Sequence, residues 1–600
     1  MAQAIAYRGP DGADVWSDVE CGVALAHQRL AIIDLSPAGH QPMRNAEAGL
    51  SIVFNGEIYN FADLRSELQS RGHVFRSQSD TEVILAAYGE WGEDCLSRFN
   101  GMFAFAIHDE RRRRLFLARD RVGEKPLFVA LTNGTLRFAS ELKALFTDPA
   151  FPRRIDPEAL DCYLTMGFVP GERCILRGVN KLAPAHALLF DLESASVRVF
   201  RYWQLPDPPA AAAGADAETL LDELEALLAD AVRRQLVADV PVGILLSGGV
   251  DSSLVTALAV RAASDVRTFT IRFPGSGRYD ETEHARLIAH RFGTKHQELE
   301  AEAGSSVDLL PMLARQFDEP IVDSSMIPTY LVSRLVRGHC TVALGGDGGD
   351  ELFGGYEHYS RLLWVQQRLG AVPLALRRAV AQAATLALPV GFKGRNWLQG
   401  LSVDFNAGVP LVATVFDRRV RRALVANEAA ESAERIRQER MPQTSDLLER
   451  ATRMDFENYM PEDILVKVDR ASMLNSLEVR APLLDYRIVE FAFGKVPPRL
   501  KATTGTRKVL LKMLTTRLLP PEFDRHRKQG FSIPLAAWLT TTQWREFFHD
   551  VLLNPGQLLF SHKTVRGLLE GQARGRANTE RLFSLVMFEL WRREYDISLP

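Results

Sequence analysis

The chain has 600 residues and a formal net charge of −3, and 46% of its residues are hydrophobic and 24% charged. This is the composition of a globular protein, and the length predicts two to four domains. The charge argues against a protein that binds nucleic acid over its whole surface. The start shows no secretion signal, and the most apolar stretch, 371–392, contains two arginines and two flanking prolines. We therefore expect a cytoplasmic protein without a membrane span.

The five cysteines are scattered along the chain, and no two of them have C-x-x-C spacing. They are Cys21, Cys95, Cys162, Cys174 and Cys340. This distribution predicts reduced thiols, and it argues against a disulfide framework and against a zinc site.

The first third of the chain, up to about residue 201, consists mainly of short β-prone runs separated by Gly, Pro, Asn and Asp. We expect strands within 21–30, 50–54, 103–108, 115–118, 127–131 and 187–190, and helices at 61–71 and 81–91. Strands with two interspersed helices indicate a sandwich with helices on its faces. Residues 205–217, rich in Pro, Ala, Gly and Asp, are interpreted as a linker.

From residue 218 onward, helical and strand patterns alternate, which is typical of parallel strands joined by crossover helices. The expected elements are helices at 220–236, 281–292 and 327–337 and strands at 243–246, 266–273 and 341–344. Residues 361–454 are rich in Ala, Arg and Leu, so we expect a helical insert there. The tail to residue 600 is predicted to be mostly helical.

The loop at 247–253, with the sequence SGGVDSS, joins an apolar strand to a helix. Paired glycines leave backbone N–H groups pointing outward at a helix start, so this turn predicts a cradle for phosphate oxygens. The hydroxyls of Ser252 and Ser253 can donate hydrogen bonds, and Asp251 can hold a magnesium ion against the same oxygens. The alternative is an ordinary glycine-rich turn.

No lysine follows these glycines, whereas a kinase-type loop reads G-x-x-x-x-G-K-[ST]. The loop therefore predicts binding of pyrophosphate as a leaving group, attack at an α-phosphate and an adenylated intermediate. A second loop, GGDGGDE at 345–351, follows the strand at 341–344. It falls at the carboxyl end of that strand, which is where open α/β sheets bind ligands.

Further motifs occur in order along the chain. In the first half they are RGPDG at 8–12, RL at 29–30, NGEIYN at 55–60, SDTE at 79–82 and RDR at 119–121. In the second half they are YDE at 279–281, DEP at 318–320, DSS at 323–325, MPEDIL at 460–465, KVDR at 467–470, EVRAP at 478–482 and KQGF at 528–531. With the two loops above, this ordered set resembles the glutamine-dependent asparagine synthetases and their amidotransferase relatives.

The resemblance implies an α/β multidomain protein. Residues 1–204 would form an αββα amidotransferase sandwich that is truncated at its start. Residues 218–600 would form a parallel α/β adenylating domain with helical additions. The first domain would release ammonia from glutamine, and the second would use ATP and Mg²⁺ to adenylate the β-carboxylate of aspartate. Ammonia would then displace AMP and give asparagine.

The resemblance also implies a glutamine site in the first domain. Arg29 would bind the α-carboxylate of glutamine as a charge-assisted pair. Asn55 and Gly56 would form the oxyanion hole, and Glu57 and Asp80 would receive the amino group.

The start of the chain departs from the family pattern, in which Met-Cys-Gly supplies an N-terminal cysteine as nucleophile. Here the sequence MAQAIAY leads directly to the RGPDG motif, and Cys21 falls in an expected strand. Either the start codon is assigned too far downstream, or the protein uses free ammonia. Loss of a strand would expose a sheet edge, which favours the first explanation. As printed, the sequence does not support glutamine hydrolysis by the family mechanism.

In the second domain, the resemblance assigns Asp251 and Asp350 to magnesium. Asp347 would act as a general base, and Lys528 would contact the α-phosphate. Pyrophosphate would be bound by Ser247, Gly248, Gly249, Ser252 and Ser253, and adenosine would contact Leu245, Ile271 and Gly346. Gly345 stands where the family often has Ser, so one hydroxyl contact to the nucleotide is missing there.

Two alternatives remain open from the sequence. A relative with the same machinery could amidate another carboxylate, for example in β-lactam-type, natural-product or polysaccharide chemistry. A non-catalytic subunit is the second alternative, against which the presence of the acidic loop residues and Lys528 argues. We expect small-molecule substrates, no nucleic acid or membrane partner, and a homodimer.

Overall fold

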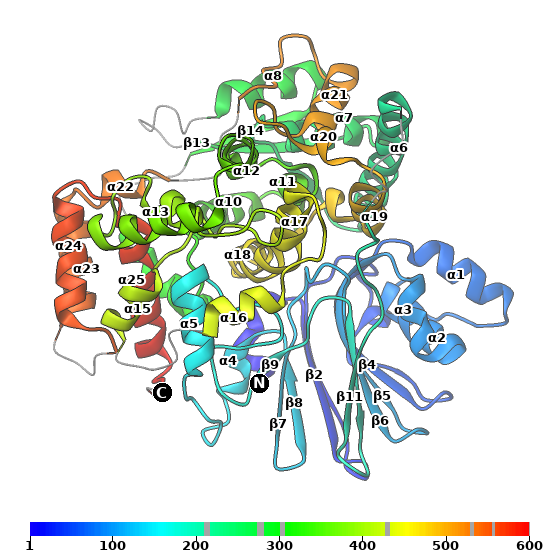
Figure 1. The fold of residues 1–600 in the computed structure, drawn as a ribbon. Helices are drawn as coiled ribbons and strands as arrows, with labels where there is room; N and C mark the ends of the chain where they lie inside the picture. The colour runs from blue at the N-terminus through cyan, green and yellow to red at the C-terminus, as the bar shows by residue number, and fades with distance from the viewer. Residues whose placement is uncertain are drawn as a thin grey trace.

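The computed structural model describes residues 1–208, 216–272, 281–300, 306–425, 432–527, 533–554 and 559–598. An antiparallel sheet region forms the N-terminal part, and a parallel α/β sheet with many helices forms the rest (Figure 1). The α/β architecture with two kinds of sheet was expected from the sequence and is confirmed. Lys528 and the YD pair of the YDE motif lie outside the described residues.

The N-terminal part is built on a six-stranded antiparallel sheet with the strand order β11-β10-β6-β5-β4-β3. Its strands are β3 (Met43–Asn45), β4 (Leu50–Ile58), β5 (Gly101–Asp109), β6 (Arg114–Arg119), β10 (His186–Asp191) and β11 (Val197–Arg201). Helices α1 (Phe61–Ser70) and α2 (Asp80–Trp91) cover one face. Strand alternation directs Ile52 and Phe54 of β4 toward these helices.

The opposite face of this sheet packs on two smaller sheets. One is the hairpin of β1 (Gly12–Asp18) and β2 (Val23–Arg29), and the other contains β7 (Phe128–Thr132), β8 (Thr135–Ala139) and β9 (Asn180–Lys181). A second hydrophobic core lies on this face, where Val53 of β4 packs with Leu25 and Val129. The expected strand at 21–30 is observed as Val23–Arg29, so Cys21 lies in the hairpin turn rather than in a strand.

The C-terminal part is organised on a five-stranded sheet with the order β14-β13-β12-β15-β16, and every neighbouring pair is parallel. The strands are β12 (Val242–Leu245), β13 (Arg267–Arg272), β14 (Lys295–Glu300), β15 (Val342–Leu344) and β16 (Glu478–Arg480). The crossover helices include α6 (Ala217–Gln235), α7 (Val250–Ala262), α8 (Thr282–Phe292) and α10 (Met326–Arg337). The chain first adds β13 and β14 on one side of β12 and then adds β15 and β16 on the other side. The strand order therefore reverses between β12 and β15.

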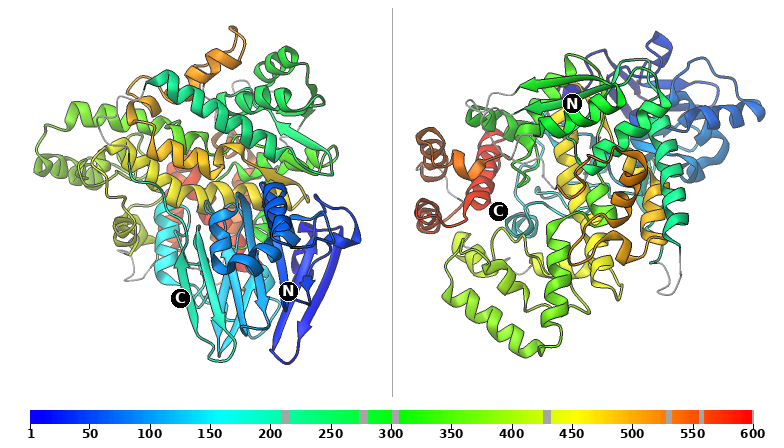
Figure 2. Two further views of the ribbon diagram at one scale, coloured as in Figure 1. Left: turned by 90° about the vertical axis from the view of Figure 1, so that its right-hand side faces the viewer. Right: turned by 90° about the horizontal axis from the view of Figure 1, so that it is seen from above.

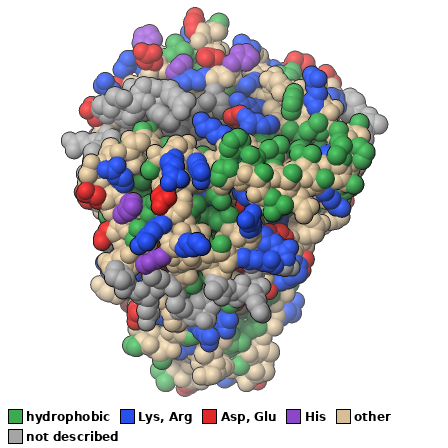
Figure 3. Space-filling view, turned by 60° about the vertical axis from the view of Figure 1, so that its left-hand side comes forward, with side chains coloured by type: hydrophobic (Ala, Val, Ile, Leu, Met, Phe, Trp, Pro, Cys, Tyr) green, Lys and Arg blue, Asp and Glu red, His purple; other side chains and the backbone are tan. Residues whose placement is uncertain are grey.

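The region from 357 to 454 consists of helices joined by turns and loops, and its first helices project from the side of the molecule (Figure 2). Its helices are α12 (Glu357–Leu369), α13 (Leu374–Ala387), α14 (Arg395–Gly400), α15 (Arg418–Leu424), α16 (Ser432–Glu439) and α17 (Leu447–Met454). Hydrophobic side chains gather on one face of the protein (Figure 3), and Trp364, Leu376 and Leu386 are each more than half exposed.

The remaining helices complete the C-terminal part. They include η6 (Asp455–Ile464), α18 (Leu465–Met473), α19 (Tyr486–Gly494), α21 (Val509–Leu518), α23 (Thr542–Leu553), α24 (His562–Ala573) and α25 (Thr579–Glu594). Within the described ranges, no helix combines the length and the apolar character that crossing a bilayer requires.

A buried ion-pair network joins the two parts of the chain. The guanidinium of Arg8, in η1 (Ala2–Arg8), donates two hydrogen bonds to Asp469 of α18, at 2.8 and 2.9 Å. The same group lies 2.7 Å from Oε1 of Glu141. All three side chains are buried, so the pairing is shielded from water.

Candidate functional site

The two glycine-rich loops leave the carboxyl ends of neighbouring parallel strands. The first follows β12 and leads into α7, and the second follows β15 and leads into α11 (Gly349–Phe353). Ile244 of β12 pairs in register with Leu344 of β15, so both loops begin at the same edge of the sheet. This is the point at which the strand order reverses, and ligands of open α/β sheets bind at such a point.

The first loop is held by hydrogen bonds among its own groups. Oγ of Ser247 lies 3.0 Å from Oγ of Ser252 and accepts a hydrogen bond from the backbone N–H of Gly249 at 3.3 Å. Gly248 has φ +72°, and a Cβ there would lie 2.6 Å from the backbone nitrogen of Ala285. Only glycine fits this position, because both its backbone angle and its close contact exclude a side chain.

A lysine lies between the two acidic residues of the loops. Nζ of Lys508 is 2.7 Å from Oδ1 of Asp350 and also forms an ion pair with Asp251. Burial works against the charge of this lysine, but the two carboxylates raise its pKa above the ordinary value. Lys508 directly precedes α21 and has φ +53°, a left-handed conformation that non-glycine residues rarely adopt. Asp251 and Asp350 thus share one cation, the ammonium group of Lys508.

A cavity of about 280 Å³ lies over these loops. The predicted residues that line it are Leu245, Ser247, Gly249, Asp251, Ser252, Ile271, Gly345, Gly346, Asp347 and Asp350. Gly248 and Ser253 are not among its lining residues, and Ser253 is fully buried. Its wall also contains basic residues, namely Lys467, Arg507, Lys508, Lys512 and Arg527. The combination of carboxylates and basic groups suits a polyanionic ligand with its counterion.

Asp347 lies in this cavity within reach of charges of both signs. Burial raises the pKa of its carboxyl, and Asp251 and Asp350 add to the rise, whereas Lys467 opposes it. Lys467 itself forms a buried ion pair with Asp323, with 3.1 Å between Nζ and Oδ2. A carboxylate with a raised pKa is a better proton acceptor than an ordinary one.

A second cavity of about 250 Å³ lies in the N-terminal part. It is lined by all five residues predicted for glutamine binding, Arg29, Asn55, Gly56, Glu57 and Asp80. Nδ2 of Asn55 is buried, and no hydrogen-bond partner for it exists within the described part of the chain. Such a donor can stabilise an oxyanion.

The guanidinium of Arg29 is held by the loop that follows β2. It donates hydrogen bonds to the backbone carbonyls of Ile33 at 3.3 Å, Asp34 at 2.5 Å and Ser36 at 3.3 Å. Since these contacts fix the side chain, Arg29 presents an oriented positive charge at the cavity wall.

Glu57 and Asp80 are buried close to each other beside this cavity. Burial and the neighbouring Asp80 raise the pKa of Glu57, and Arg480 opposes the rise. Burial also raises the pKa of Asp80 to about 6, although its Oδ2 accepts a hydrogen bond from the backbone N–H of Ile58 at 3.0 Å. Nη2 of Arg480, on β16, lies 3.3 Å from Oε2 of Glu57. A residue of the C-terminal part therefore balances charge at this cavity.

A third, much smaller cavity of about 20 Å³ adjoins the cavity over the loops. It shares Asp347, Val468 and Val479 with the cavity over the loops. Met102, which also lines it, is paired in register with Glu57 of the N-terminal cavity. The small cavity is therefore next to the cavity over the loops and one strand pairing away from a residue of the N-terminal cavity.

Comparison with known proteins adds to this geometry. The family model described as asparagine synthase matches residues 223–593, and the model described as a glutamine amidotransferase domain matches residues 1–203. The chain is 31% identical to an asparagine synthetase (glutamine-hydrolyzing) of Bacillus subtilis over 596 residues, covering 98% of this chain and 92% of that protein. The chain belongs to the asparagine synthetase family. A putative asparagine synthetase (glutamine-hydrolyzing) of Mycobacterium bovis is 33% identical over 611 residues, covering 98% and 91% of the two chains.

Among solved structures, the glutamine phosphoribosylpyrophosphate amidotransferase of B. subtilis gives a TM-score of 0.25 at 14% identity. That match covers 49% of this chain and 61% of the other chain. Membership of the asparagine synthetase family identifies the chain as an enzyme of the ligase type that uses ATP and small-molecule substrates.

Several residues of the cavity over the loops received no role from the sequence, and Lys467 and Lys508 are two of them. Lys467 stands in the KVDR motif, which contributed to the resemblance and could have suggested it. Lys508 follows Thr506 and Arg507 in a short polar stretch without a motif. Only the tertiary structure places Lys508 at the two carboxylates, because about 150 residues or more separate it from both.

Proposed function

We propose that this chain converts aspartate, ATP and ammonia to asparagine, AMP and pyrophosphate. The strongest support is that Asp251 and Asp350 both form ion pairs with the ammonium group of Lys508. Asp251 belongs to the proposed phosphate-binding loop, which contains no lysine. A loop of this kind suits the departure of pyrophosphate, because no lysine follows the glycines to reach a terminal phosphate.

The residues present fit ATP with a divalent cation. The Lys508 ammonium already lies between the two carboxylates as a cation does, and a Cβ on Gly349 would come within 2.5 Å of Oδ1 of Asp251. We therefore propose that Asp251 and Asp350 would hold Mg²⁺, whose chemistry is to neutralise phosphate charge. Ser247, Gly249 and Ser252 would bind the pyrophosphate part, and Leu245, Ile271 and Gly346 the adenosine part.

Asp347 is the proposed proton acceptor for the incoming nitrogen. Its carboxyl has a raised pKa and interacts electrostatically with the acidic pair and with Lys467. Removal of a proton from ammonium at this carboxylate leaves neutral ammonia, whose lone pair can attack an activated carboxyl carbon. Lys508 would keep the two magnesium-binding carboxylates from repelling each other before the nucleotide binds. Lys528 retains its proposed contact with the α-phosphate.

The N-terminal cavity supports a glutamine-binding role. Asn55 and Gly56 would stabilise an oxyanion, Arg29 would bind the α-carboxylate, and Glu57 and Asp80 the amino group. None of the described residues that line this cavity is a cysteine. Glutamine hydrolysis through these residues therefore needs a thiolate from elsewhere, and we propose ammonium as the nitrogen donor of the chain as printed.

The proposal is tested with purified protein, Mg²⁺, ATP and ammonium chloride. Aspartate should give equal amounts of AMP, pyrophosphate and asparagine. Formation of ADP in place of AMP would contradict the proposed chemistry. A panel of other carboxylates tests the acceptor, and faster pyrophosphate release with one of them than with aspartate would reassign the substrate. The homodimer also stays a prediction, which light scattering can check.

A further inference from the structure

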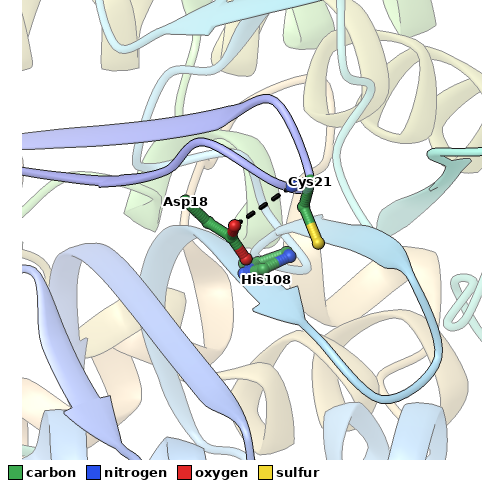
Figure 4. Close-up of side chains that lie close together, drawn as sticks. All are labelled: Asp18, Cys21 and His108. Carbon is green, nitrogen blue, oxygen red and sulfur yellow. Dashed lines mark hydrogen bonds between the residues drawn. The ribbon is translucent and has the colours of Figure 1, made fainter.

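Three side chains with metal-binding atoms meet at the tip of the β1–β2 hairpin, away from both large cavities. Asp18 ends β1, Cys21 lies in the turn that follows, and His108 lies on β5 of the six-stranded sheet. A carboxylate oxygen, the thiol sulfur and a ring nitrogen all lie within 4.8 Å of one another (Figure 4). None of the three residues lines the cavities described above.

The local structure holds these groups before any ligand arrives. Oδ1 of Asp18 accepts a hydrogen bond from the backbone N–H of Cys21 at 3.0 Å, and the other carboxylate oxygen points toward the His108 ring in Figure 4. The ring of His108 packs on Trp16 with 5.5 Å between ring centroids. Backbone and core packing therefore fix the positions of the carboxylate and the imidazole.

The imidazole of His108 is the most unusual of the three groups. The side chain is 1% exposed, and its Nε2 is buried with no hydrogen-bond partner within the described residues. A buried nitrogen without a partner is costly, and a neutral imidazole is a good metal ligand.

Charges around the cluster also suit a cation. The carboxylates of Asp18 and Glu110 place negative charge near the Cys21 sulfur. Arg113 is the opposing charge, with Nη1 at 3.9 Å from the sulfur, but its Nε forms an ion pair with Glu193 at 2.8 Å. Negative charge from Asp18 and Glu110 near the sulfur therefore suits a bound cation.

We propose that Asp18, Cys21 and His108 bind one divalent transition-metal ion of borderline softness, with Zn²⁺ as the natural occupant. Sulfur, nitrogen and oxygen ligands together are typical of Zn²⁺, and three protein ligands leave a fourth position for water. On binding, the sulfur–hydrogen bond breaks, a sulfur–metal bond forms and the proton goes to solvent, with no change of oxidation state. The sequence analysis argued against a zinc site because no two cysteines have C-x-x-C spacing. That argument does not apply to this cluster, because it contains only one cysteine and its ligands come from two different sheets.

Such an ion would fasten the hairpin to the six-stranded sheet. β2 begins just after Cys21, and Arg29 of the N-terminal cavity is its last residue. The site is therefore structural, in the sense that it fixes one end of a strand whose other end contributes to the proposed glutamine site.

Titration of the tag-free full chain with Co²⁺, a spectroscopic substitute for Zn²⁺, tests the proposal. We expect one Co²⁺ per chain, a thiolate-to-cobalt charge-transfer band and its loss on addition of Zn²⁺. Cys21→Ser should remove the band, and Asp18→Asn should weaken binding at least tenfold. His40→Gln is a matched control, because His40 forms an exposed pair with Asp14 on the same hairpin, at 3.1 Å. It should bind Co²⁺ as the wild type does.

The thermal unfolding midpoint provides a second readout. Zn²⁺ should raise this midpoint in the wild type and in His40→Gln but not in Cys21→Ser. Absence of the charge-transfer band, or equal Co²⁺ affinity of the wild type and Cys21→Ser, would overturn the proposal. His108→Gln changes a buried side chain and can unfold the domain, so Cys21→Ser, at a partly exposed position, decides the outcome.

Discussion

The ammonium nitrogen of Lys508 lies 2.7 Å from Oδ1 of Asp350, and the same nitrogen pairs with Asp251 from the other loop. Three segments that are distant in sequence thus share one charge cluster at the end of the parallel sheet. Lys508 places a positive charge between two partly buried carboxylates, whose mutual repulsion is unfavourable in a site of low dielectric constant. In the proposed function, this lysine holds the two carboxylates together until a metal–nucleotide complex binds.

Substitution of Lys508 tests its contribution to catalysis. We expect Lys508→Met to lower kcat/KM for ATP by roughly 10²–10³, as loss of an electrostatic contact does in comparable sites. Lys508→Arg keeps the charge and should recover part of the rate. Lys495→Met is the control, since that lysine pairs with Glu223 at the surface. A pyrophosphate-release assay over a range of Mg²⁺ concentrations measures the effect, and an unchanged kcat/KM would exclude the role.

Substitution of Asp347 tests the proposed proton acceptor. Asp347→Asn keeps the shape of the side chain but removes the base, so amide formation should fall by about 10²–10⁴. The unfolding midpoint should stay close to that of the wild type. Glu357→Gln, at an exposed carboxylate, is the control. Asparagine formation at the wild-type rate in Asp347→Asn would contradict the assignment.

The Arg8–Asp469 pair should be important for stability. Arg8→Met leaves the carboxylates of Asp469 and Glu141 buried with less compensation, and the free energy of unfolding should fall by about 3–5 kcal/mol. The control is Arg76→Met, because the Arg76–Glu47 pair is more than 80% exposed on both sides. That variant should lose less than about 1 kcal/mol. Chemical denaturation measures both, and equal losses would show that burial is not the decisive factor.

His27 gives the stability of the N-terminal part a pH dependence. Burial lowers the pKa of His27 to about 4, and its Nε2 lies 3.0 Å from the carbonyl oxygen of Phe54. An unfolded histidine titrates near pH 6.5, so between these values the unfolded chain binds more protons. The contribution of neutral His27 to the free energy of unfolding is therefore complete above about pH 6.5, and it is lost as the pH falls toward 4.

The comparison of wild type with His27→Gln checks this sign. As the pH falls from 7 to about 4.5, the unfolding midpoint of the wild type should decrease more than that of the variant, since only the wild type takes up this proton on unfolding. Parallel decreases in the two proteins would show that His27 is not the titrating group.

The sequence predicted what depends on local patterns. The loops at 247–253 and 345–351 were found because each follows an apolar strand, and parallel strands bring their carboxyl ends to one edge. Lys508 was missed because its role depends on a distant tertiary contact. Cys21 was placed in a strand because the β-prone run 21–30 includes it, but the turn of the hairpin extends over residues 19–22.

Arg29 illustrates a further limit. The motif predicted its position at the cavity, which the structure shows, but not the three carbonyl groups that orient it. Those carbonyls belong to an irregular loop, whose course depends on packing rather than on periodicity.

The pairing of Glu57 with Arg480 bears on any attempt to study the two parts separately. A fragment that ends in the predicted linker, most of which lies outside the described residues, would place Glu57 and Asp80 beside water in place of the guanidinium that balances them. It would also leave Arg8 without Asp469. Proteolysis or truncation at residues 205–217 should therefore give fragments that associate or aggregate, rather than two domains that each fold and stay monomeric.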